Sequence, residues 1–253
     1  MKKTILAVLA MLTAAVMLAV CAEAADLADA EAKAGALKSL GLFKGVSDTD
    51  FDLNREPTRV EALVMLIRTL GEEDAALKGN YTHPFTDVPA WADAYVGYAY
   101  ETGLTKGISA TEFGSGNASA AMYVTFMLRA LGYSDANGDF AWDNPFALAR
   151  ENGIVTDEID LTRFLRADAV AVSYSALNAV MKGSKTTLAD VLIGKGVFTR
   201  DKLKLTAGVT PEDLVPAEDA VTPIFKPEPI YILPVEPKDP GLPAAVDEPA
   251  IGD

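Results

Sequence analysis

The sequence contains one cysteine and one histidine among its 253 residues. Cys21 lies in the apolar N-terminal segment, so the remaining chain can form no disulfide and no cysteine–histidine nucleophile pair. His83 precedes Pro84 in a predicted linker, where no partner for it is predicted. There is also no Gly-x-Ser-x-Gly element, no phosphate-binding loop and no two-histidine zinc motif. We therefore expect no enzyme and no cofactor, although the many acidic residues leave a glycosidase carboxylate pair open.

Positive charge is also scarce, because 22 basic residues face 36 acidic ones and the net charge is −14. Such a surface is a poor general partner for nucleic acid or for an anionic membrane. Beyond the N-terminal segment there is no apolar run long enough to span a bilayer. Any binding of an anion must therefore be local.

The N-terminus has the pattern of a secretory signal peptide. Lys2 and Lys3 precede an apolar run over residues 5–20, and small residues follow. A basic region, an apolar region and an A-x-A site are typical of such signals. We expect a signal over residues 1–24, cleaved after Ala24. Lipoprotein processing at Cys21 is the alternative, although Val20 stands where a small residue is expected.

The middle of the chain is repetitive. Residues 41–45 recur as residues 103–107, and residues 58–71 recur as residues 119–132. A weaker third copy begins a helix at Arg166 that we expect to run through Met181. Each copy reads as helix, glycine-rich loop and helix, and such units need their neighbours to bury an apolar face. The first helices of the copies are expected at residues 30–40, 91–102 and 145–152.

The helix over residues 58–71 has the clearest start in the chain. Thr58 and Glu61 form a capping box, in which each side chain accepts a backbone N–H of the first turn. Arg59 is different, because a cation is unfavourable at the positive end of a helix dipole. Free N–H groups beside a guanidinium suit an anion. A solvated arginine without a role is the alternative.

Two acidic clusters superficially resemble calcium loops, at residues 48–52 and 135–139. Both lack the bidentate acid at the last ligand position, so we expect no metal. From about residue 204 prolines become frequent, and this tail should be extended or disordered. It is either a spacer or a strip that docks on a protein partner.

The repeats resemble the S-layer homology family of bacterial cell-surface proteins. The likeness rests on residues 85–88 (Phe-Thr-Asp-Val), 91–92 (Trp-Ala), 103–104 (Gly-Leu), 58–61 (Thr-Arg-Val-Glu) and 68–71 (Arg-Thr-Leu-Gly). It covers about residues 27–203. The resemblance implies an all-α fold: three helix-loop-helix repeats in a pseudo-threefold helical bundle with prongs. The repeats are expected at residues 27–84, 85–139 and 140–203, followed by the tail at 204–253.

The resemblance also implies a ligand, a secondary cell-wall polysaccharide that often carries pyruvate ketals, bound in grooves between repeats. In the family the arginine of the Thr-Arg-Ala-Glu motif contacts the acidic sugar. In the second repeat Ala120 and Met122 replace the arginine and the acid, so the groove of that repeat is expected to lack the contact with the acidic sugar. In the third repeat Arg166 and Asp168 are kept, but Leu165 replaces the capping threonine. We therefore expect two working grooves.

Trp91 could stack on a sugar ring or pack in the core, and Asp87 could be a ligand or a turn or cap residue. The candidate ligand-binding residues are Arg59, Arg166, Glu61, Asp168, Trp91 and Asp87. The expected function is non-covalent anchoring of a secreted protein to the bacterial cell wall or surface. The alternative is a structural surface-layer or scaffold protein whose repeats and tail mediate protein–protein assembly.

Overall fold

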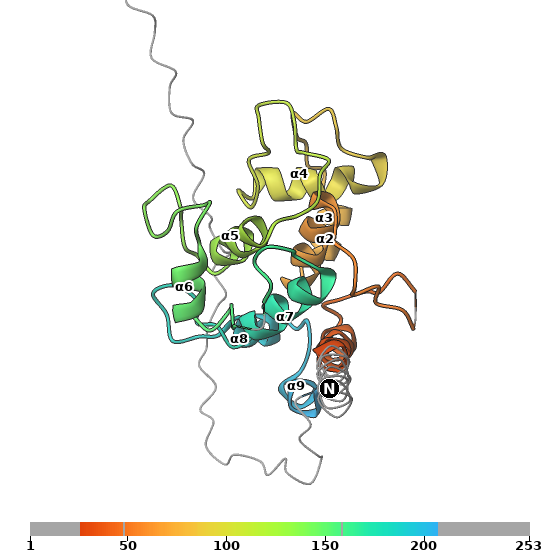
Figure 1. Ribbon diagram of the computed structural model, residues 1–253, viewed down its shortest axis with the longest axis vertical. Helices are drawn as coiled ribbons and strands as arrows, with labels where there is room; N and C mark the ends of the chain where they lie inside the picture. The colour runs from red at the N-terminus through yellow and green to blue at the C-terminus, as the bar shows by residue number, and fades with distance from the viewer. Residues whose placement is uncertain (1–25, 48, 158, 207–253) are drawn as a thin grey trace, which may run out of the picture.

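The computed structural model describes residues 26–47, 49–157 and 159–206, which form short helices joined by loops (Figure 1). The expected signal and nearly all of the expected tail lie outside these residues. The first helical stretch covers residues 26–40. The further elements are α2 (Arg59–Thr69), α3 (Glu73–Lys78), the 3₁₀ turn η1 (Ala90–Ala92), α4 (Asp93–Glu101), α5 (Ala120–Ala130), α6 (Phe146–Glu151), α7 (Arg166–Ala176), α8 (Leu188–Gly194) and α9 (Arg200–Thr206).

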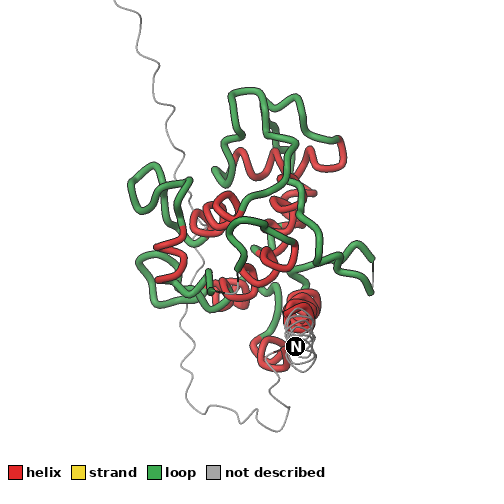
Figure 2. Tube along the Cα trace, in the orientation of Figure 1, coloured by secondary structure: helices red, strands yellow, loops and turns green. Residues whose placement is uncertain are grey.

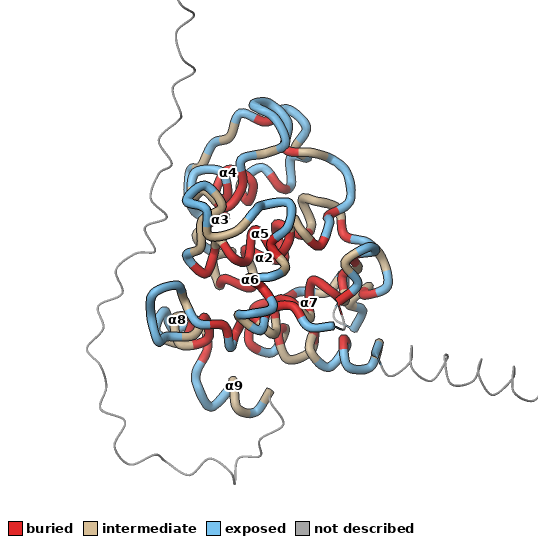
Figure 3. Tube along the Cα trace, turned by 60° about the vertical axis from the view of Figure 1, so that its left-hand side comes forward, coloured by how far each residue is buried: buried red, intermediate tan, exposed pale blue. Residues whose placement is uncertain are grey.

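Helices α2, α5 and α7 form the centre of the molecule, and each packs against the other two. Their buried side chains belong to one apolar core, visible as the red segments in the middle of Figure 3. Helix α2 is buried on most sides, because its apolar residues extend beyond a single stripe. The described residues contain no β-strand, only isolated bridges. The all-α prediction is confirmed.

The starts of these three helices are built as the sequence predicts. At α2, Thr58 Oγ1 accepts from Glu61 N at 3.3 Å, and Glu61 Oε2 accepts from Thr58 N at 2.8 Å. At α5, Ser119 provides a one-sided cap for Met122 N. At α7, Asp168 Oδ2 accepts from the N–H of Leu165 at 2.7 Å, so only the acidic half of the capping box remains.

Backbone hydrogen bonds tie two of these helix starts to a loop from another repeat. Arg59 N donates to Gly116 O at 2.8 Å, and the neighbouring residues Thr58 and Asn117 form an antiparallel bridge. Arg166 N donates to Arg55 O at 2.9 Å in the same manner. Figure 2 shows how long these loops are relative to the helices. Each tied helix start therefore lies beside a loop that could form one wall of a groove.

Several predicted boundaries were wrong. Helix α7 ends at Ala176 instead of Met181, because the chain turns there and Val180 forms a bridge with Thr187 at the start of α8. The helix expected at residues 91–102 begins as the 3₁₀ turn η1. Helices α3, α8 and α9 were not predicted. None of the helices in the described residues is long and apolar enough to cross a membrane.

Candidate functional site

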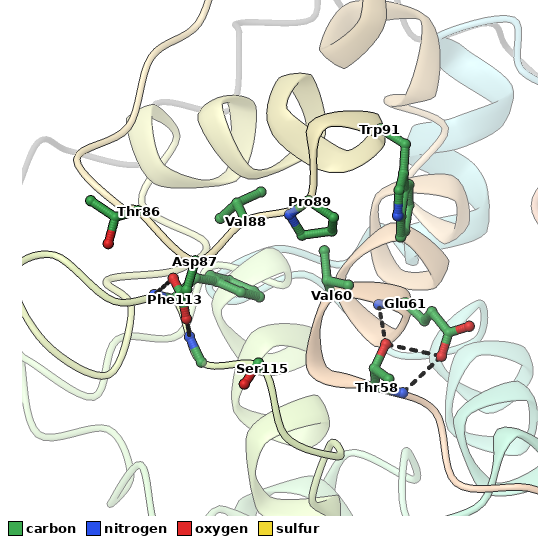
Figure 4. Close-up of a pocket in the computed structure, with 11 residues that line it drawn as sticks. Thr58, Val60, Glu61, Thr86, Asp87, Val88, Pro89, Trp91, Phe113 and Ser115 are labelled. Atoms are coloured by element: carbon green, nitrogen blue, oxygen red, sulfur yellow. Dashed lines mark hydrogen bonds between the residues drawn. The ribbon is translucent and has the colours of Figure 1, made fainter.

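A hollow of about 630 Å³ lies between the start of α2 and two loop segments of the second repeat. Figure 4 shows Val60, Glu61 and Trp91 on one side of it and Asp87 with Phe113 on the other. We call it the Trp91 groove. It brings together three of the six predicted ligand residues. Its lining residues are Thr58, Val60, Glu61, Thr86, Asp87, Val88, Pro89, Trp91, Phe113, Gly114 and Ser115.

Asp87 fixes the position of the loop that forms one wall of the groove. Its carboxylate accepts from Phe113 N at 2.7 Å and from Gly114 N at 2.8 Å. These backbone hydrogen bonds, with Arg59 nearby, lower the pKa of Asp87 below its usual value. The helix-cap interpretation of Asp87 was wrong, since η1 follows Pro89 without any side-chain cap. Asp87 instead holds the loop that carries Phe113 against the groove.

Glu61 lines the opposite wall and also has partners within the protein. Arg55 Nη2 donates to Glu61 Oε1 at 2.7 Å, and Arg55 Nη1 donates to Glu61 Oε2 at 2.8 Å. These hydrogen bonds, together with those from Thr58, lower the pKa of Glu61 to about 2. Both carboxylates of the groove are thus ionised at neutral pH and occupied by donors of the protein itself.

Trp91 offers an open aromatic face. Its side chain is 57% exposed, so the interpretation that it packs in the core was wrong. It stands at the groove with Val60 and Pro89, which supply further apolar surface. Hydroxyl groups of Thr86 and Ser115 line the same hollow. An exposed ring beside hydroxyls is a surface that can bind an amphipathic ring such as a sugar.

Arg59 lies behind one wall of this groove and does not line it. Its guanidinium carbon is 5.1 Å from the ring centre of Phe113 and 5.7 Å from that of Phe126. Its Nε is enclosed and has no hydrogen-bond partner among the described residues. Burial, and secondarily the nearby Arg129, lowers the pKa of Arg59. A Cβ atom at Gly114, which lines the groove, would come within 3.2 Å of Arg59 Cδ.

Arg166 has a different environment from Arg59. It is only 5% exposed, and its Nε donates to the carbonyl oxygen of Phe51 at 3.2 Å. Its Nη1 lies 3.7 Å from Met65 Sδ, and its guanidinium is 5.8 Å from the ring of Phe43. The guanidinium of Arg166 thus has several partners inside the protein.

A second hollow, of about 780 Å³, lies between the helical residues 26–40 and the start of α7. Asp168 lines it, but Arg166 does not. Asp168 is 8% exposed and accepts the N–H groups of Leu165 and Asp160. Burial raises the pKa of Asp168. The structure therefore does not bring the two predicted ligand residues of the third repeat to one open surface.

Two residues near the Trp91 groove were missed by the motif comparison. Gly114 and Arg55 lie outside the quoted motifs, and only the fold shows that one borders Arg59 and the other binds Glu61. The structure also gives His83 partners that were not predicted. Its Nδ1 accepts from Phe85 N, and its Nε2 lies 3.1 Å from Asp93 Oδ1. No group of three or more His, Cys, Asp or Glu side chains in the described residues is placed to hold a metal ion.

Comparison with curated proteins finds relatives at the bacterial surface. The chain is 31% identical over 123 residues to a "Cell surface protein" of Thermoanaerobacter kivui, covering 47% of this chain and 16% of that protein. It is 32% identical over 145 residues to the "Middle cell wall protein" of Brevibacillus brevis, covering 53% and 14%. A third match is 32% identical over 100 residues to the "Surface layer protein" of Brevibacillus choshinensis, covering 38% and 9%.

The matched parts are less than a fifth of each of these relatives. No protein-family model matches the chain. All three relatives carry names of the cell surface, the cell wall or the surface layer. The chain is accordingly a protein of the cell wall or cell surface.

Proposed function

We propose that this chain is a non-covalent anchor that binds an acidic polysaccharide of the bacterial cell wall through the Trp91 groove and Arg59. The three repeats would be S-layer homology repeats with the boundaries 27–84, 85–139 and 140–203. No catalytic role is part of this proposal. The names of the relatives support a wall or surface role, and the groove supplies the chemistry.

The observation that carries the proposal is the unsatisfied guanidinium of Arg59. No hydrogen bond from its side chain to another described residue is present, although its Nε is enclosed. A buried donor without a partner costs about 1–3 kcal/mol. A cation at a helix N-terminus costs about 0.3–1 kcal/mol more. A carboxylate-bearing ligand in the groove would offset these costs through its negative charge and, where it reaches the guanidinium, through its acceptors.

The rest of the groove suits a carbohydrate. The exposed ring of Trp91 can stack on the apolar face of a sugar, and Ser115 offers a hydroxyl group for hydrogen bonds. The hydroxyl of Thr86 donates to Thr111 O and can still accept a hydrogen bond. Asp87 and Glu61 are held by donors of the protein, so they shape the groove and can still accept from sugar hydroxyls with their remaining lone pairs. A wall polymer with an acidic substituent would satisfy the aromatic face and the arginine together.

The contribution of the third repeat is expected to be weaker. Arg166 already has partners in Phe51 and Phe43, so an anion would gain less there than at Arg59. We propose that Arg59, behind one wall of the Trp91 groove, supplies the main charged contact. Asp168 lines the second hollow without Arg166, and its role there would be chiefly to fix the start of α7.

The test is sedimentation of the purified full chain with cell walls of the bacterium that produces it. The comparison is with walls chemically stripped of their non-peptidoglycan polymer. The key variant is Arg59→Ala. The matched control is Arg150→Ala, which removes an exposed arginine from α6, outside the groove. We expect binding to intact walls only, reduced about tenfold or more by Arg59→Ala, as for the loss of one charged hydrogen-bond partner, and unchanged by Arg150→Ala.

Equal binding to intact and stripped walls would refute the polysaccharide ligand. An equal effect of Arg59→Ala and Arg150→Ala would refute the groove as the place of binding. If the folded protein binds no walls but associates with itself or with another surface protein, the assembly alternative takes its place.

A further inference from the structure

Arg55 lies outside the Trp91 groove but controls the charge of one of its walls. Its guanidinium forms a two-point contact with the carboxylate of Glu61, with N···O distances of 2.7 and 2.8 Å. Its Nε donates to Asp52 Oδ2, so one cation serves two carboxylates. Glu61 lines the groove, whereas Arg55 does not. The arginine thus approaches Glu61 from a side that the ligand does not use.

This placement matters because two carboxylates, Asp87 and Glu61, line the groove, whereas neither Arg59 nor Arg55 does. Asp87 interacts electrostatically with Arg59, and its oxygens accept two backbone N–H groups. Glu61 has no other cation at hydrogen-bond distance among the described residues than Arg55. Without Arg55, the wall formed by Glu61 would present an uncompensated negative charge to an acidic ligand. Like charges across a partly desolvated groove repel strongly enough to decide between partners.

We propose that Arg55 is a positioning and specificity-determining residue, which neutralises Glu61 and thereby makes the Trp91 groove compatible with an anionic ligand. This inference rests on the function proposed above. Arg55 does not touch the ligand. It acts through Glu61, by offsetting the charge of that carboxylate and by holding it where it accepts the N–H of Thr58.

A purely structural role for Arg55 makes a different prediction. If Arg55 only stabilised the start of α2, then losing Arg55 would harm folding, and removing the charge of Glu61 as well would bring further harm. If Arg55 acts through charge, removing the charge of Glu61 restores the ligand binding that is lost with Arg55. The two roles are therefore separable by a double-mutant cycle.

The experiment measures binding of the full chain to the acidic polysaccharide released and purified from host cell walls, by titration calorimetry. The variants are Arg55→Gln, Glu61→Gln and the double variant, with thermal unfolding recorded for each. Arg68→Gln is the matched control, since it also removes an arginine that pairs with a carboxylate, Glu73, but at the other end of α2.

We expect Arg55→Gln to weaken binding about fivefold, the effect of one unit charge across a partly solvated groove. The double variant should return to within about twofold of the unaltered protein. The fivefold difference should shrink at a salt concentration of about 1 M, where the Debye length falls to about 3 Å. Arg68→Gln should bind like the unaltered protein.

Equal binding by Arg55→Gln and the unaltered protein would overturn the role of Arg55 and leave the proposed function intact. A double variant that binds as weakly as Arg55→Gln would overturn it also, and would show that Arg55 is structural. If Arg55→Gln fails to fold, the folded double variant decides, because the proposal requires it to bind normally. No binding by the unaltered protein would refute the proposed function and this inference with it.

Discussion

Replacing Arg59 by methionine is expected to stabilise the fold while it weakens wall binding. Methionine keeps much of the side-chain length and is apolar, so it suits the space between the rings of Phe113 and Phe126. The change removes an unsatisfied buried donor, worth about 1–3 kcal/mol. It also removes a cation from a helix N-terminus, worth about 0.3–1 kcal/mol.

Against these gains stands the loss of the cation–π contacts of Arg59, worth about 0.5–2 kcal/mol. The net expectation is a gain of about 1 kcal/mol in the free energy of unfolding, which corresponds to a rise of about 2–4 °C in Tm for a domain of this size. Chemical denaturation and calorimetry of the full chain measure both quantities. Wall sedimentation measures the loss of binding on the same samples.

The matched control is Arg129→Met at the end of α5. Arg129 donates to both carboxylate oxygens of Asp135, at 2.8 and 2.7 Å, and to the carbonyl of Leu104. Its removal leaves a partly buried carboxylate unpaired and should cost about 3 kcal/mol. If Arg59→Met destabilised the protein as much as Arg129→Met, Arg59 would be a structural residue, and the case for an anion site would fail.

Three further changes test the site. Arg166→Met should destabilise the protein by about 2 kcal/mol in chemical denaturation, because it leaves the carbonyl oxygen of Phe51 without its buried donor. Unchanged stability would show that this arginine is not structural. Trp91→Ala should weaken binding in the wall sedimentation assay with little change in Tm, since the indole is exposed. A large fall in Tm would show that Trp91 contributes to the packing of the core. Arg55 lowers the pKa of Glu61 from 4.5 to about 2, so the stability that this pair contributes is complete above about pH 4.5 and is lost as the pH falls toward 2. Glu61→Gln should therefore make the free energy of unfolding less dependent on pH over that window. An unchanged pH dependence would contradict the pairing.

Local sequence patterns predicted the features of the fold that depend on neighbours in the chain. The capping box of Thr58 and Glu61 spans three residues, and the stop at Gly71 needs only a positive φ, which glycine adopts freely. The recurrence of residues 58–71 as residues 119–132 predicted α2 and α5 as corresponding helices of two repeats. The short helices α3, α8 and α9 were missed, because six or seven residues are too few for a reliable period and, unlike the equally short α6, none of them was assigned a place in the repeat pattern.

Roles that depend on distant partners could not be predicted in the same way. Asp87 holds backbone groups of Phe113 and Gly114, which lie far along the chain, and nothing near Asp87 in the sequence indicates this. No partner was predicted for His83, yet its ring nitrogens contact Phe85 N and Asp93 Oδ1. The sequence left two interpretations of Trp91 open, stacking on a sugar and packing in the core, and only the fold, which leaves the residue exposed, excludes the second.

The contrast between Arg59 and Arg166 shows most clearly what motif matching leaves out. Both open a core helix, and both donate their backbone N–H to a loop of another repeat. The two loops share a turn in which Ile108 bonds to Glu112 and Val46 bonds to Asp50. When the two loops are aligned on this turn, Gly114 corresponds to Asp52, and both residues have a positive φ.

The residue at this left-handed position differs between the two loops. Gly114 has no side chain that could bind the neighbouring guanidinium of Arg59. Asp52 has a carboxylate, which binds Arg55, and the carbonyl of the adjacent Phe51 receives Nε of Arg166. Nε of Arg166 therefore has an acceptor in a backbone carbonyl of its loop, whereas Nε of Arg59 has no hydrogen-bond partner among the described residues. The motif arginine is the same in both repeats, and the loop facing it decides whether that arginine remains available to a ligand.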